Sequence, residues 1–120
     1  MVSLGRLKQF LARAGYRAEW DRYSIVQVEK IYVNGTEKLA EGNSPHGLRG
    51  KKLRDVPNRA ENGRPIIEMS NLGLRNMKEA VITFFHETYH QKRMRDYGDT
   101  GTEDDAEEFG QAMWRKLRGK

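Results

Sequence analysis

The segment HETYH places two histidines and a glutamate within about one helical turn. His86 and His90 are four positions apart, and Glu87 directly follows the first histidine. Because residues i and i+4 of an α-helix share a face, both imidazoles can reach one cation. Glu87 is rotated by about 100° from His86, so its carboxylate would stand beside the cation rather than bind it. The pattern predicts two metal ligands and a general base on one rigid element.

A catalytic zinc site usually has three protein ligands, so the histidine pair needs a third partner. The segment TEDDAEEFG offers acidic candidates on a predicted helix that Thr102 would cap. On that helix Glu103 is the acid nearest the apolar face, and Glu107 follows one turn later on the same side. We therefore predict Glu103 as the third ligand and Glu107 as a hydrogen-bond partner of a ligating histidine. His46, in SPHGLRG, is the alternative third ligand.

The absence of cysteine narrows the kind of metal site. Without thiols the chain has neither a disulfide framework nor a thiolate site, so imidazole and carboxylate must hold any metal. We expect one Zn²⁺ per chain, although Mn²⁺, Fe²⁺ and Co²⁺ accept the same ligands.

Length and composition predict one domain spanning residues 1–120. Hydrophobic residues make up 37% and charged residues 32%, which is typical of a small polar globule rather than a disordered tail. No apolar run approaches the ~20 residues that span a bilayer. Arg6, Lys8 and Arg13 interrupt the N-terminal segment, which therefore does not resemble a signal peptide. We expect a cytoplasmic protein that does not bind membranes.

The formal net charge of +5 comes partly from basic clusters at 48–54, at 91–95 and at the C-terminus. A solvated basic surface is the simplest interpretation of these clusters. A nucleic-acid surface or an acidic protein partner fits them as well, so charge alone does not choose among the three.

Three helices are expected to position the chemistry. The first is capped by Ser3 and stops near Gly15. The HETYH helix begins after Asn76 and ends at Gly98, and apolar residues cover most of its circumference before His90, which predicts a buried central helix. The third runs from Thr102 to about residue 117. The histidines would then lie where the central helix emerges from the core.

The strands are predicted between the first two helices. Residues 23–35 are rich in β-branched and aromatic residues and predict one long strand or a hairpin that turns at Asn34-Gly35, with a short return strand within 36–42. A long loop should follow over 43–63. Residues 64–70 predict another short strand, and Pro65 favours an edge position for it. The expected fold class is α+β, with a small and mostly antiparallel sheet.

The HETYH helix and the acidic helix together resemble the gluzincin arrangement. In that group an HExxH helix precedes a second helix that carries Glu-x-x-Ala-(Asp/Asn). Here the second motif is Glu103, Ala106 and Glu107, with Glu107 in place of Asp or Asn. The chain is similar to the ImmA/IrrE-type peptidases, whose second helix tends to read E-x-x-A-x-x-F-A; Phe109 matches, and Gly110 replaces the last Ala.

The resemblance covers about residues 64–117 and extends to the compact zincin domains of bacterial polymorphic toxins. It implies a minimal zincin-like fold and a zinc endopeptidase that cuts a protein substrate. The strand at 64–70 would be the edge strand that aligns the substrate. Glu87 would act as the general base, and Tyr97 or His46 would help to stabilise the oxyanion. A toxin domain would act in the cytoplasm of a target cell and be neutralised by an acidic immunity protein.

Two further classes of function stay open from the sequence. A DNA-associated protease or a nucleic-acid-binding module would use the basic segments, and its binding would weaken steeply with salt. A regulator-cleaving peptidase is an alternative form of the peptidase itself. A zinc-stabilised interaction domain without turnover would keep its properties when Glu87 is replaced.

Overall fold

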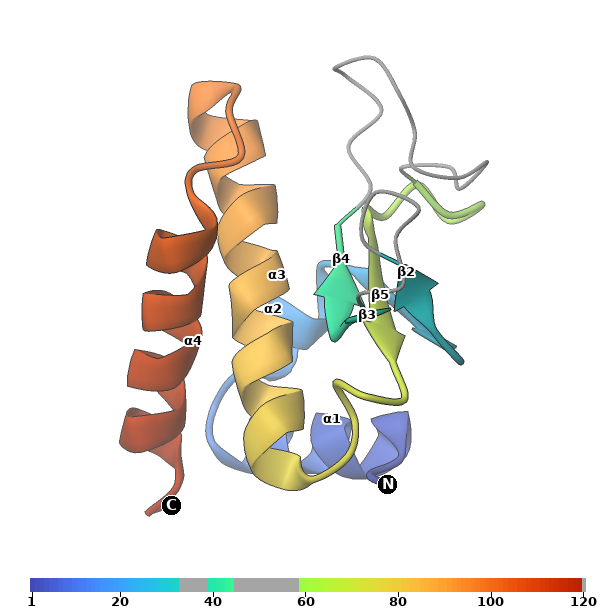
Figure 1. The fold of residues 1–120 in the computed structure, drawn as a ribbon, viewed down its shortest axis with the longest axis vertical. Helices are drawn as coiled ribbons and strands as arrows, with labels where there is room; N and C mark the ends of the chain where they lie inside the picture. Colours follow the sequence, from blue (N-terminus) through green and yellow to red (C-terminus); the bar gives the residue numbers. More distant parts are fainter. Residues whose placement is uncertain (33–38, 45–58, 120) are drawn as a thin grey trace.

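The computed structural model describes residues 1–32, 39–44 and 59–119, and over these residues the chain has an α+β fold (Figure 1). The elements in chain order are α1 (Leu4–Arg13), α2 (Arg17–Asp21), β1 (Ser24–Val28), β2 (Ile31–Tyr32), β3 (Leu39–Ala40), β4 (Gly42–Asn43), β5 (Ile66–Ser70), α3 (Met77–Tyr97) and α4 (Glu103–Leu117).

The three expected helices begin at their predicted caps. The side chains of Ser3, Asn76 and Thr102 each accept a hydrogen bond from the backbone N–H three residues later, at 3.2, 2.9 and 3.0 Å. These bonds satisfy donors that the first helical turn leaves free. Helix α3 ends at Gly98, which adopts the left-handed conformation with φ 74°. The short helix α2 has no such cap and was not predicted.

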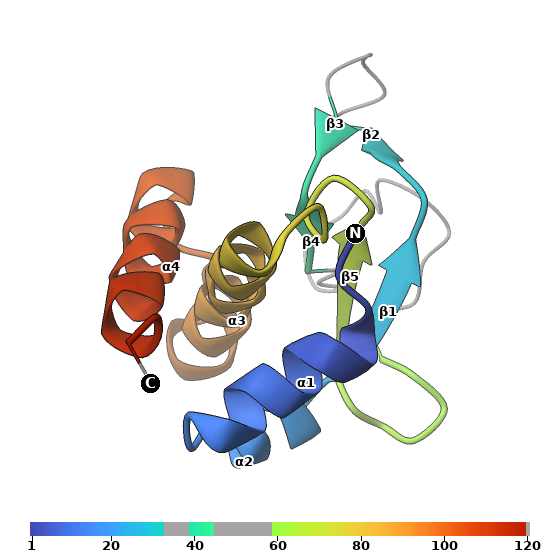
Figure 2. The ribbon, with the colours of Figure 1, turned by 90° about the horizontal axis from the view of Figure 1, so that it is seen from below.

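Helix α3 is the central element, as its apolar circumference predicts. It lies between α4 on one side and the sheet with α1 on the other (Figures 1 and 2). Phe84 and Phe85 are both fully buried, and their rings contact Trp20 and Tyr16 at centroid distances of 5.5 and 5.4 Å. Packing on both sides leaves α3 little freedom to rotate, which fixes the directions of its polar side chains.

The larger sheet is mixed, with strand order β1-β5-β4. Strands β1 and β5 pair in parallel over five residues, from Ser24↔Ile66 to Val28↔Ser70, whereas β4 joins β5 antiparallel over two. Strands β2 and β3 form a separate antiparallel pair. The longest pairing is thus parallel, contrary to the mostly antiparallel sheet expected. The long connection between β1 and β5 makes this possible, because parallel strands need such a crossover.

The predicted edge position of the 64–70 strand is wrong, since β5 lies in the middle of its sheet. Pro65 precedes the strand, so its missing N–H removes no bond from the ladder, and its carbonyl accepts from Ser24 N at 2.8 Å. Among the described residues, the strand at the edge beside α3 is β4. Any strand that aligns a substrate beside α3 would therefore be β4 rather than β5.

The segment 23–35, predicted as one long strand or a hairpin, forms β1 and β2. The return strand within 36–42 is confirmed as β3, which pairs antiparallel with β2 as the hairpin alternative predicts. The Asn34-Gly35 turn and His46 lie outside the described residues. None of the helices in the described ranges combines the length and apolar character that a membrane span requires.

Candidate metal centre

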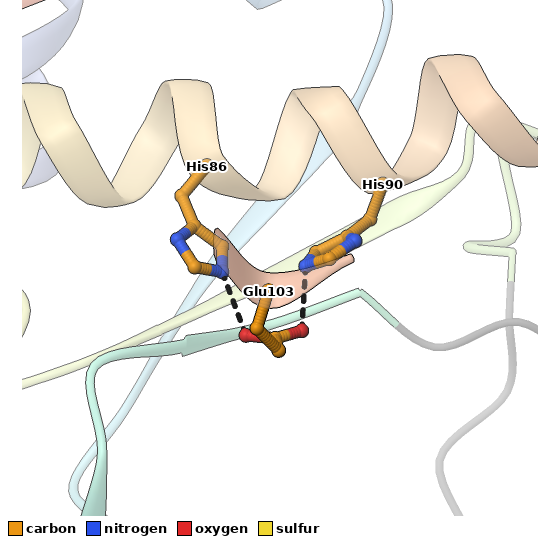
Figure 3. A group of neighbouring side chains, drawn as sticks. All are labelled: His86, His90 and Glu103. Atoms are coloured by element: carbon orange, nitrogen blue, oxygen red, sulfur yellow. Dashed lines mark hydrogen bonds and ion pairs between the residues drawn. The ribbon is translucent and has the colours of Figure 1, made fainter. Parts of the chain in front are cut away.

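His86 and His90 project from the same face of α3 toward the carboxylate of Glu103 at the start of α4 (Figure 3). The Nε2 atom of His86 lies 3.0 Å from one carboxylate oxygen, and the Nε2 atom of His90 lies 2.8 Å from the other. The centroids of the two imidazole rings are 5.0 Å apart. Within the described part of the chain, these three residues form the group whose ligand atoms could hold a metal ion. The two predicted histidines and the predicted acid therefore converge.

A short return segment brings Glu103 to the histidines. Helix α3 continues seven residues past His90, about 10.5 Å along its axis. The five residues 98–102 then run back beside α3, and an extended segment of that length spans about 16 Å. The carboxylate of Asp99 accepts two bonds from Arg93, at 3.0 and 2.9 Å, which ties the segment to the helix. Gly101 passes so close to Tyr89 that a Cβ would lie 2.6 Å from the ring. The short gap between the two motifs is thus sufficient.

Each histidine is oriented through its other ring nitrogen. His86 Nδ1 lies 3.1 Å from the carboxylate of Glu107, and His90 Nδ1 lies 2.7 Å from the carbonyl of Thr100. A carbonyl only accepts, and so does an ionised carboxylate, so both Nδ1 atoms are assigned as donors. The predicted role of Glu107 beside a histidine agrees with this geometry. In neutral rings both Nε2 atoms then carry a lone pair that faces Glu103.

These lone pairs explain why the site suits a cation. His90 Nε2 is buried and makes no hydrogen bond with any described residue, although an oxygen of Glu103 is only 2.8 Å away. Two acceptors at that distance repel each other unless positive charge lies between them. One proton would satisfy a single contact, whereas one divalent cation would satisfy both nitrogens and the carboxylate. The donor set of two imidazoles and one carboxylate is one that zinc and related metals accept.

Ligand spacing also fits. In a tetrahedral site with bonds of about 2.0–2.1 Å, neighbouring ligand atoms are ~3.4 Å apart. The nitrogen–oxygen distances of 2.8 and 3.0 Å are slightly shorter than this spacing, and all the ligand atoms lie within 4.8 Å of one another, so modest shifts of the Glu103 carboxylate and of the rings would bring them to one ion. That side chain is 79% exposed, which leaves it free to adjust.

Glu87 lies beside the three ligands without belonging to them, as the helical rotation predicts. Its carboxylate is buried, and its Oε2 atom is 4.0 Å from His86 Nε2. The hydroxyl of Ser44, at the end of β4, donates to the other oxygen, Oε1, at 2.7 Å. One oxygen of Glu87 is therefore held by the strand, and the other faces the histidines.

Burial and neighbouring charges shift the pKa values of two site residues. Burial alone would lower the pKa of His86, but the carboxylates of Glu87, Glu107 and Glu103 outweigh it, and the pKa is raised. Burial raises the pKa of Glu87, partly opposed by the imidazoles and by the Ser44 hydroxyl. A glutamate with a raised pKa exchanges protons closer to neutral pH, as a general base and acid must.

The site opens into a cleft of about 560 Å³. Strands β3 and β4 line one wall, α3 forms the floor, and Thr100 with the first turns of α4 closes the other side. The described lining carries four carboxylates, from Glu41, Glu87, Glu103 and Glu107, and no lysine or arginine. This acidic cleft contrasts with the net charge of +5 for the chain.

The remaining site candidates are not brought to the cleft by the described structure. Tyr97 is 70% exposed, its ring lies under the guanidinium of Arg93 at 4.2 Å, and it does not line the cleft. His46 lies outside the described residues. Sequence reasoning missed Ser44 and the Thr100 carbonyl. Ser44 stands in a Gly- and Asn-containing stretch that indicates only a loop. Any residue can supply a backbone carbonyl, so the sequence near Thr100 does not indicate its role either.

Comparison of the chain with protein-family models, with curated proteins and with solved structures finds no match.

Proposed function

We propose that this protein is a zinc metallopeptidase of the zincin type, which cleaves a protein substrate internally. One observation carries the proposal: His86, His90 and Glu103 converge on one point, and the buried carboxylate of Glu87 stands beside that point without joining it. Such a division between three ligands and one neighbouring base is what metal-assisted hydrolysis requires.

Each residue has a distinct part in the proposed reaction. His86, His90 and Glu103 would hold Zn²⁺, while Glu107 and the Thr100 carbonyl orient the two imidazoles. When bound, zinc would supply Lewis-acid activation of water and of the substrate carbonyl. Glu87 would take the proton of the attacking water at Oε2, the oxygen that faces the histidines, and then deliver it to the leaving amine.

A polypeptide substrate is favoured by the shape of the cleft. Strand β4 forms one wall, and among the described residues it has no further strand on its outer side. An extended peptide could pair with this edge through its backbone and so lie across the metal centre. Backbone pairing recognises a main chain rather than one small molecule, which supports a polypeptide substrate.

The proposal is tested by comparing wild type with Glu87→Gln. The glutamine keeps the size of the side chain but cannot accept the proton. We expect about one zinc per chain in both proteins by elemental analysis. Hydrolysis of fluorescein-labelled casein should be at least ~100-fold slower in Glu87→Gln, the usual scale for a lost general base.

Equal hydrolysis by the two proteins would contradict the proposed mechanism. Zinc binding without any hydrolysis in the wild type would instead favour a zinc-stabilised interaction domain. Addition of a chelator separates these outcomes from a contaminating serine protease, because only the metal-dependent activity is lost and then restored by zinc.

A further inference from the structure

Strand β4 lies directly against the side chain of Glu87. Ser44, which follows β4 immediately, is 7% exposed, and its hydroxyl is 2.7 Å from Glu87 Oε1 and 3.1 Å from the backbone oxygen of the same residue. A hydroxyl has one proton to donate. The contact to the carboxylate is the shorter and therefore the stronger of the two. The hydroxyl therefore holds the carboxylate in place.

Gly42 contacts the same side chain from two residues earlier in the strand. A Cβ at this position would lie 3.0 Å from both Cγ and Oε2 of Glu87 and 2.8 Å from Cγ2 of Thr83. Gly42 is not among the glycines with positive φ, so the backbone does not require glycine here. Glycine is needed because a larger side chain would meet Thr83 and Glu87. Residues i and i+2 of a strand share a face, which explains why Gly42 and Ser44 meet one carboxylate.

We propose that Gly42 and Ser44 form a cradle that positions Glu87, with Oε1 bound to the strand and Oε2 turned toward the histidines. The role as base rests on the function proposed above, but the cradle itself is a property of the chain. Both are positioning residues, because neither touches the reacting atoms.

The need for a cradle follows from the flexibility of glutamate. Its long side chain can adopt several rotamers. Without a hydrogen-bond partner, the buried carboxylate would destabilise the fold and would not be held in one position. A shift of about 1 Å in a catalytic group can cost about 100-fold in rate. A fixed Oε1 leaves Oε2 as the single free oxygen, at 4.0 Å from His86 Nε2.

The first test removes the hydroxyl. With labelled casein as the probe, we expect Ser44→Ala to lower kcat by about 10- to 100-fold, with KM and zinc stoichiometry near wild type. Ser44→Cys, which retains a weak donor, should recover part of the loss. The matched control is Thr88→Val, which removes a fully buried hydroxyl that bonds Phe85 O within α3. It should destabilise the fold without changing kcat.

The second test fills the space. Gly42→Ala should lower kcat by a similar factor, and the effect should persist in the double variant Gly42→Ala/Thr83→Ser, where the clashing methyl of Thr83 is gone but Glu87 is still displaced. Gly5→Ala is the control, because a Cβ there meets nothing closer than 3.9 Å. If the double variant regains wild-type kcat, the clash with Thr83 was the cause, and the role of Gly42 is overturned.

A readout independent of turnover completes the experiment. Crystal structures of the zinc-free proteins should show the Glu87 carboxylate rotated or in several conformers in Ser44→Ala, but unchanged in Thr88→Val. An unmoved carboxylate in Ser44→Ala would overturn the cradle, whether or not the wild type hydrolyses casein. An inactive wild type with a displaced carboxylate in Ser44→Ala would refute the proposed function and leave the cradle standing.

Discussion

The ring nitrogens of the two histidines define the chemistry at the scale of single residues. Each Nδ1 is occupied by an oxygen acceptor, so each Nε2 is left to bind, and both face one carboxylate at 3.0 Å or less. Backbone and side-chain oxygens thus select the tautomer before any metal arrives. The spacing of HETYH predicted the shared face, and the acidic helix predicted Glu107 as a partner of one histidine. The Thr100 carbonyl, which is the partner of His90, was decided by the return segment.

The third ligand can be tested against its neighbours on the same helix. Glu103→Ala should weaken zinc binding by well over the ~10- to 100-fold typical of an outer partner, because it removes a direct ligand. Asp104→Ala and Glu108→Ala are the matched controls, since both side chains are exposed and neither lines the cleft. Competition with a chromophoric chelator measures the three affinities. Equal losses in all three variants would reject Glu103 as the ligand.

At the scale of elements, the contact between α3 and α4 sets the distance between the ligands. Gly110 of α4 is buried against the backbone of Ile82, and a Cβ there would lie 2.6 Å from the Ile82 carbonyl oxygen. This close approach gives a physical reason for glycine at this position of α4. The sequence shows a glycine inside a predicted helix, and only the packing of α4 on α3 explains it.

We therefore expect Gly110→Ala to destabilise the protein, although alanine favours a helix more than glycine does. Alanine usually stabilises a helix interior by about 1 kcal/mol relative to glycine. Here the clash with backbone must push α4 away, at a cost of about 1–3 kcal/mol, and carry Glu103 and Glu107 with it. We expect a lower melting temperature and weaker zinc binding. Gly119→Ala, where a Cβ meets nothing within 4 Å, should change neither. A raised melting temperature with unchanged zinc affinity would contradict this packing argument.

At the scale of the whole molecule, a bound ion would join two elements that the chain connects only through a turn. His86 and His90 belong to α3, whereas Glu103 belongs to α4. Ions bind the folded chain and not the dispersed ligands of the unfolded one, so they stabilise folding by mass action.

Removal of metal should accordingly lower stability. At zinc concentrations about 100-fold above Kd, the expected gain in the free energy of unfolding is about 2.7 kcal/mol. Differential scanning calorimetry of the chelator-treated protein, with and without added zinc, measures the shift. His86→Ala should melt at the same temperature in both conditions. A zinc-dependent rise of equal size in that variant would place the ion elsewhere.

The core also predicts how stability changes at high pH. Burial, and then the charge of Glu19, raises the pKa of the Tyr23 hydroxyl from 10.0 to about 12. Between those values the unfolded chain loses this proton while the folded chain keeps it. The contribution of Tyr23 to the free energy of unfolding is thus fully present below pH 10. It falls by roughly 2 kcal/mol as the pH rises toward 12.

Urea unfolding at pH 9 and pH 11 measures this loss, and Tyr23→Phe is the control. The variant has no hydroxyl to ionise, so its decline between the two pH values should be smaller by about 1 kcal/mol, the part of the loss that is reached by pH 11. Identical declines in the two proteins would show that Tyr23 is not responsible.

The sequence by itself determined the features that neighbouring residues decide. Ser3, Asn76 and Thr102 cap their helices through bonds to residues three positions away, and the helical period places His86 with His90 and Glu103 with Glu107. Such patterns span only one or two helical turns, so they can be recognised in the sequence alone.

Only the tertiary structure decided which distant residues meet. Strand β5 lies at the centre of its sheet rather than at the edge, because β1 pairs with one side of it across a long connection and β4 pairs with the other. Ser44 reaches Glu87 across 43 positions, and Gly42 contacts the same side chain. No local period relates residues so far apart, and a two-residue strand leaves no alternation to detect. The positions of the predicted ligands followed from the helices, whereas the surroundings of the base depended on a contact that exists only in the folded chain.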